Sequence, residues 1–157
     1  MDGNENAAPE TVLADRAAAL YAVLAERIGP FVEACVLTRI GDAFGGVTPV
    51  QAERARDAGA RAAAAVLPVL RVLLDADVDA QAATPLQVLR DAVSYATTAL
   101  DAVAVPPLAR DRFLAERFPE DRYDLIPASM GVLGGDVEDL AIAWGAAKAL
   151  VHRRRHR

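Results

Sequence analysis

The two histidines of the chain, His152 and His156, stand four residues apart close to its C-terminal end. Histidine titrates near neutral pH and is the commonest protein ligand for metal ions. The 151 residues before them contain no histidine, so that part of the chain cannot form a Ser-His-Asp triad, a Cys-His pair or a histidine-ligated zinc site. These absences favour a non-enzymatic protein without a cofactor.

The same two histidines could share one metal ion, because residues i and i+4 lie on one face of a helix. Four arginines surround them, namely Arg153, Arg154, Arg155 and Arg157. Their charge repels a metal ion, and a helix end of this kind tends to fray. We therefore expect no metal site here and interpret residues 152–157 as a basic electrostatic tail, which complements the dipole of the preceding helix.

The net charge of −5 hides an uneven distribution. The four arginines of the tail leave 13 basic against 22 acidic residues in the rest of the chain, which therefore carries a net charge of −9. An acidic surface repels nucleic acids and anionic membranes. Contact with a nucleic acid is therefore expected only through the tail, and the expected partner is another protein or a second copy of the chain.

Chemistry that needs no histidine could come from paired carboxylates. Asp121 and Asp124 have the i, i+3 spacing that lets two helical side chains share a divalent cation, and Asp136 and Asp139 repeat it. These four residues are weak candidates for the site of a magnesium-dependent hydrolase, our second alternative function. Nearby arginines also suggest surface ion pairs, such as Arg117 with Asp121, which is the simpler interpretation.

The run from Asp75 to Asp79 begins like a calcium-binding loop, in which alternating carboxylates converge on one cation. Such a loop needs a glycine at its sixth position and a bidentate glutamate at its twelfth, but this chain has Ala80 and Leu86 there. We therefore expect a solvated acidic linker between two helices.

Aromatic side chains make up only 5% of the chain. Three of them, Tyr21, Tyr95 and Trp144, are candidates for lining a ligand pocket between helices. Such a pocket would make the protein a small-molecule-binding helical sensor, our first alternative function. Packing within the core is the competing interpretation of the same residues.

The elements that must position these side chains are helices. Apolar residues recur with spacings of three and four, as in an amphipathic helix. No stretch long enough for a strand alternates apolar and polar residues with a period of two. Helices are expected over residues 10–28, 31–44, 49–74, 85–104, 107–118 and 137–153. Gly29 and Pro30 should separate the first two, while Thr48, Thr84 and Asp136 should cap three of the others. The prediction is an all-α single-domain bundle of five or six helices over residues 1–157, with residues 1–8 flexible.

The last of these helices is apolar on several faces, since Ile142, Ala146 and Leu150 accompany the inward-facing Trp144. A helix of this kind belongs at the centre of a bundle or at an interface between subunits. Our first hypothesis is therefore a non-enzymatic interaction module that self-associates or docks a protein partner through apolar helix faces.

Composition adds an expected origin and compartment. Lys148 is the only lysine, and the excess of arginine and alanine is typical of a GC-rich bacterial genome. Cys35 is the only cysteine, which excludes a disulfide framework. The first residues are polar and acidic, unlike a signal peptide, and the apolar runs are short, so we expect a cytoplasmic protein.

Overall fold

The computed structural model describes residues 7–80 and 82–157, which form an all-α single domain as the sequence predicts. Its α-helices are α1 (Pro9–Phe44), α2 (Pro49–Asp75), α3 (Pro85–Ala102), α4 (Arg112–Arg117) and α5 (Gly135–Arg155), and a short 3₁₀ helix, η1 (Met130–Leu133), precedes α5. Most of the segment expected to be flexible, residues 1–8, lies outside the described residues. In the described ranges, no helix is both long and apolar enough to cross a membrane.

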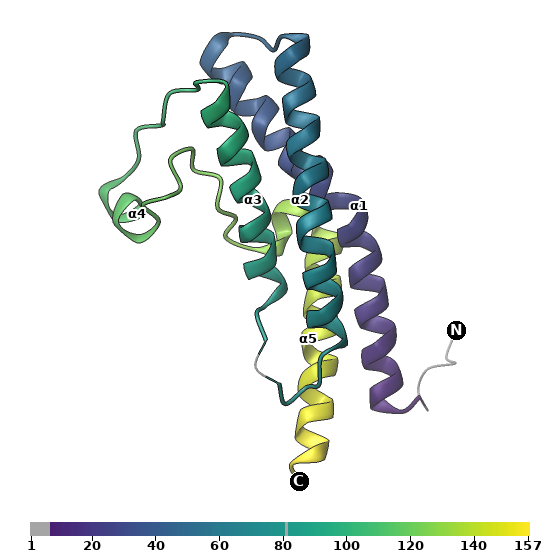
Figure 1. The fold of residues 1–157 in the computed structure, drawn as a ribbon. Helices are drawn as coiled ribbons and strands as arrows, with labels where there is room; N and C mark the ends of the chain where they lie inside the picture. The colour runs from purple at the N-terminus through teal and green to yellow at the C-terminus, as the bar shows by residue number, and fades with distance from the viewer. Residues whose placement is uncertain (1–6, 81) are drawn as a thin grey trace.

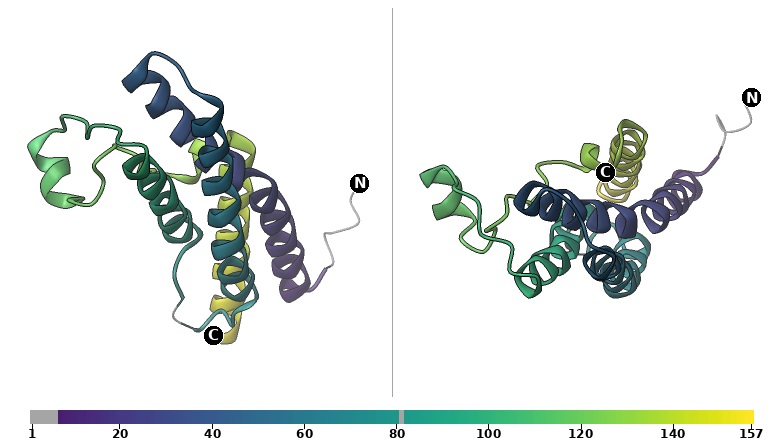
Figure 2. Two further views of the ribbon diagram at one scale, coloured as in Figure 1. Left: turned by 45° about the horizontal axis from the view of Figure 1, so that its top comes forward. Right: turned by 90° about the horizontal axis from the view of Figure 1, so that it is seen from above.

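Helix α1 is the central element of the bundle, because it packs against α2, α3 and α5. In Figure 2, α2 and α3 lie on one side of α1 and α5 lies on the other. The short α4 extends away from the bundle on a long loop (Figure 1). An apolar stripe along α1 is buried in the resulting core, and it consists of Ala17, Leu20, Leu24, Ile28, Val32, Val36 and Ile40.

The sequence predicts a break at Gly29 and Pro30, and this prediction is wrong, because α1 continues through both residues. A proline inside a helix removes one backbone hydrogen bond and commonly kinks or ends the helix. Here Ile28 and Val32, which flank the expected break, are buried in the same core. Packing of the continuous stripe outweighs the local preference, as tertiary contacts commonly do.

Helices α1 and α2 approach each other closely at Gly29 and Gly59. A Cβ atom added at position 59 would lie 2.4 Å from the backbone oxygen of Gly29, far inside an ordinary contact. Other small side chains of the same stretch of α2 are buried as well, including Ala55, Ala58 and Ala62. The Ala- and Gly-rich first half of α2 thus allows tight helix packing.

The starts of α2 and α3 confirm two predicted caps. Thr48 and Gln51 form a reciprocal capping box, with Thr48 Oγ1 accepting from the Gln51 N–H at 3.2 Å and Gln51 Oε1 accepting from the Thr48 N–H at 2.9 Å. Thr84 Oγ1 accepts from the Gln87 N–H at 3.2 Å. These bonds satisfy backbone donors that the first helical turn leaves unpaired.

The two later helices begin at other residues than predicted. Helix α4 starts only after Asp111, whose carboxylate accepts from the Phe113 N–H at 2.8 Å, so the helix expected over residues 107–118 is short. Helix α5 starts at Gly135, and its N-cap is Gly134 with a φ of 131°, not Asp136. The Asp136 carboxylate binds Arg27 of α1 instead, with an Nη2–Oδ2 distance of 2.8 Å. This bond ties the start of α5 to α1.

Candidate functional site

The three candidate pocket aromatics lie in different places. Tyr21 lines a pocket of about 240 Å³, where the Arg71 guanidinium stands 3.9 Å from the centre of its ring. Tyr95 lines an open groove of about 990 Å³ between α3 and residues 118–126. Trp144 lines neither hollow and is only 8% exposed within the core. The structure therefore does not gather these aromatics around one ligand pocket.

The four candidate carboxylates are also separate. Asp121 is buried, and its two oxygens accept hydrogen bonds from the backbone N–H groups of residues 125 and 126 at 2.7 and 3.0 Å. Asp136 forms its ion pair with α1, and the remaining two, Asp124 and Asp139, are exposed. Within the part of the chain that the structure describes, no three of these four place ligand atoms within 4.8 Å of one another. The predicted magnesium site therefore lacks a geometric basis.

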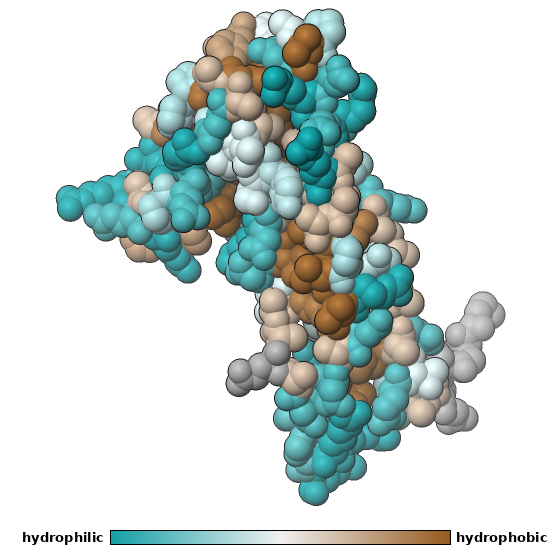
Figure 3. Space-filling model, in the orientation of Figure 1, coloured by the Kyte–Doolittle hydropathy of each residue, from teal (hydrophilic) through white to brown (hydrophobic). Residues whose placement is uncertain are grey.

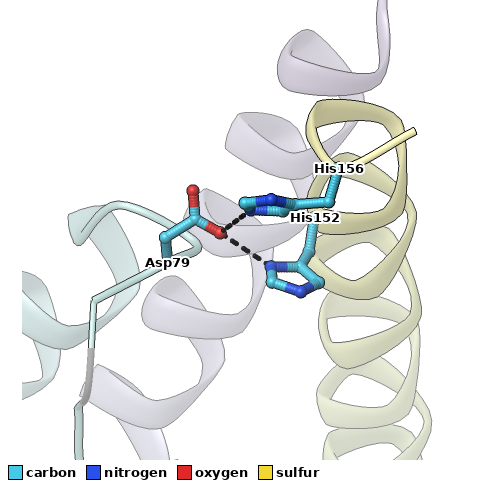
Figure 4. Close-up of side chains that lie close together, drawn as sticks. All are labelled: Asp79, His152 and His156. Carbon is cyan, nitrogen blue, oxygen red and sulfur yellow. Dashed lines mark hydrogen bonds and ion pairs between the residues drawn. The ribbon is translucent and has the colours of Figure 1, made fainter.

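The acidic segment after α2 and the basic tail meet in space, although 73 residues separate Asp79 from His152. Asp79 Oδ1 lies 2.7 Å from His152 Nδ1 and 2.8 Å from His156 Nε2, as Figure 4 shows. Beside them, Arg155 Nη1 lies 2.7 Å from Asp77 Oδ2 and 3.7 Å from Asp79 Oδ2. We call these five residues the linker–tail cluster. The tail is helical as far as Arg155, where α5 ends.

Hydrogen bonds within the linker–tail cluster favour the ionised carboxylates. The bond with His156, supported by His152, lowers the pKa of Asp79. The backbone N–H of Asp79 and then the Arg155 side chain lower the pKa of Asp77, and Asp77 raises the pKa of Arg155 in return. All five side chains are exposed, so each pair adds little to stability. Their main effect is to hold the linker beside the end of α5.

Helix α5 lies at the edge of the bundle (Figure 2), not at its centre. Its buried side chains are Val137, Trp144 and Val151, one every seven residues, and α5 packs on α1 and η1. The opposite face is exposed, and Ile142 on it is 64% exposed. We call this the outer face of α5, and it comprises Asp139, Ile142, Gly145, Ala146, Ala149, Leu150 and Arg153.

A second apolar patch lies on the C-terminal half of α2, where Figure 3 shows hydrophobic side chains at the surface. Its large exposed residues are Val69 and Val72, and Val72 is 72% exposed. Val69 also lines the open groove beside Tyr95. Like the outer face of α5, this patch on α2 is apolar and exposed.

The sequence gives little indication of the linker–tail cluster or of the position of α5 at the edge of the bundle. Opposite charge is the only signal that could relate the acidic linker to the basic tail. The apolar outer face is visible in the sequence, but its place at the edge of the bundle is not. No known protein family, no curated protein and no solved structure matches this chain.

Proposed function

We propose that the chain is a self-associating helical module, in which the outer face of α5 packs against the same face of a second copy. The observation that carries the proposal is the position of α5. A helix with apolar residues on opposite faces needs a partner on each, and α1 covers one of them. The other face, with Ile142 at its centre, stays open at the edge of the bundle.

The sequence of this face is suited to an antiparallel pair. Asp139 and Arg153 stand seven residues on either side of Ala146, and Ile142 and Leu150 stand four residues on either side. When two copies of α5 cross at Ala146 about a two-fold axis, Asp139 of each lies opposite Arg153 of the other. Ile142 then lies opposite Leu150. Such an isologous contact closes on itself and gives a dimer.

Small residues at the centre favour this arrangement. Gly145, Ala146 and Ala149 present little side-chain volume, so the two helices can approach closely. Ile142 and Leu150 supply the apolar area whose removal from water drives association. The Asp139–Arg153 pairs at the rim add little affinity, but they select the antiparallel orientation over the parallel one, in which like charges would meet.

The experiment is sedimentation velocity or light scattering on the full chain across the micromolar range. We expect a concentration-dependent dimer for the wild type. Ile142→Glu places charge in the centre of the contact and should raise the dissociation constant at least about tenfold, or about 1.4 kcal/mol. The matched control is Val72→Glu, a similarly exposed apolar position on α2, which should leave the dimer intact.

Circular dichroism and thermal unfolding should show that both variants fold, since both positions are exposed in the isolated chain. A wild type that stays monomeric over this range would overturn the proposal. So would a dimer that V72E dissociates and I142E leaves intact, because the contact would then lie on the α2 patch.

A further inference from the structure

We propose that Asp79, His152 and His156 form a binding site for one divalent transition-metal ion. One ligand atom from each residue lies within 4.8 Å of the other two. Two ligand atoms that are each about 2.0–2.1 Å from a tetrahedral ion stand about 3.3 Å apart. The two nitrogen–oxygen distances of 2.7 and 2.8 Å are those of hydrogen bonds and are about 0.5 Å shorter than this spacing. All three side chains are exposed, so they can rotate apart and bind the ion in place of these two hydrogen bonds.

The two parts of the site are held in place before any ion binds. His152 and His156 follow each other by one helical turn at the end of α5, and their ring centres are 4.5 Å apart. The linker is fixed by the Arg155–Asp77 ion pair at 2.7 Å and by the bond from the Asp79 N–H to Asp77 Oδ1 at 2.9 Å. An ion therefore meets a helix that supplies two nitrogens and a linker that supplies one oxygen.

The charge of the cluster accepts a cation despite the arginines of the tail. Arg155 is the nearest positive charge, 3.7 Å from Asp79 Oδ2, but Asp77 is closer to it and offsets its charge. With neutral imidazoles, these five residues carry a net charge of −1. The tail arginines alone predict repulsion of a metal ion, but the two linker carboxylates make the net charge of the cluster negative.

The donor set decides which ions fit. Two imidazole nitrogens and one carboxylate oxygen suit Zn²⁺, Co²⁺, Ni²⁺ or Cu²⁺, whereas Mg²⁺ and Ca²⁺ prefer oxygen ligands throughout. Because all three residues are exposed, the remaining coordination positions are open to water. A bound ion would fasten the linker after α2 to the end of α5 and so stabilise the folded chain.

Titration calorimetry of the full chain with Zn²⁺ tests the site. We expect one ion per chain, and Asp79→Asn should weaken binding by about tenfold or more, because it removes one of three ligands. The matched control is Asp75→Asn, an exposed carboxylate four residues before Asp79 that lies outside the cluster. It should change the affinity less than about threefold, and Zn²⁺ should raise the melting temperature of D75N more than that of D79N.

Three results would overturn the proposal. The wild type could fail to bind Zn²⁺, or D79N could bind as tightly as the wild type, as a simple pair of histidines would. Zn²⁺ could also raise the molar mass of the I142E variant in light scattering, which would place the ion between two molecules. The expected result in I142E is an unchanged affinity, because Ile142 lies outside the cluster. A failure of dimerisation therefore leaves this test intact.

Discussion

Replacing Gly59 by alanine tests the helix contact on which the bundle is built. The added Cβ would lie 2.4 Å from the Gly29 oxygen, about 1 Å short of the 3.4 Å at which ordinary contact begins. The obstacle is the backbone of α1, so the two helices must move apart. Overpacking typically costs about 1–3 kcal/mol, and the higher helix propensity of alanine returns about 1 kcal/mol. Since the clash is with backbone, we expect a net loss of about 1–2 kcal/mol in the free energy of unfolding.

Urea denaturation followed by circular dichroism measures this loss. Gly41→Ala is the matched control, because it lies in the same pair of helices and its added Cβ meets nothing within 4 Å. G41A should keep or raise the stability by up to about 1 kcal/mol. The same chemical change then acts in opposite directions at two positions. If G59A were as stable as G41A, the close approach of α1 and α2 would be refuted.

Two further predictions concern hydrogen-bonded side chains. The Tyr123 hydroxyl lies 2.7 Å from Asp101 Oδ1 and 2.9 Å from the Val105 oxygen, so Tyr123→Phe should cost about 1–2 kcal/mol in urea denaturation. Burial raises the pKa of Tyr123 to about 12, so this contribution is present below pH 10 and is lost as the pH rises to 12. A free energy of unfolding that stays unchanged over this pH range would contradict the prediction. The bond from Arg27 lowers the pKa of Asp136, so the pair stabilises the fold above about pH 4 and less as the pH falls. Asp136→Asn should flatten the acid limb of the stability curve, and an identical limb would contradict the assignment.

The sequence predicts those features of the helices that depend on side chains interacting with backbone a few residues away. The capping residues Thr48 and Thr84 and the apolar spacing of α3 depend only on residues a few positions away, and the structure confirms them. The break at Gly29 and Pro30 fails for the opposite reason. Buried side chains before and after it share one core, and that packing is not visible in a local pattern.

For the candidate site residues, too, the outcome depends on packing that is not visible in a local sequence pattern. Tyr21, Tyr95 and Trp144 are pocket candidates by residue type alone. Each belongs to a different helix, and whether their faces meet depends on the packing of the bundle. The contact between Asp79 and the two histidines arises because the end of α2 and the end of α5 lie at the same end of the molecule (Figure 1). Neither outcome could be predicted from spacing along the chain.

The central claim is the antiparallel pairing of α5, and a charge exchange on its outer face tests it most directly. Asp139 and Arg153 are fourteen residues apart, about 21 Å along one helix, so they cannot contact each other within a single copy. Sedimentation at low ionic strength should show weaker dimers for Asp139→Arg and for Arg153→Asp alone, since each brings like charges together. The double variant should recover most of the wild-type affinity. Single and double variants whose effects simply add would contradict the antiparallel contact.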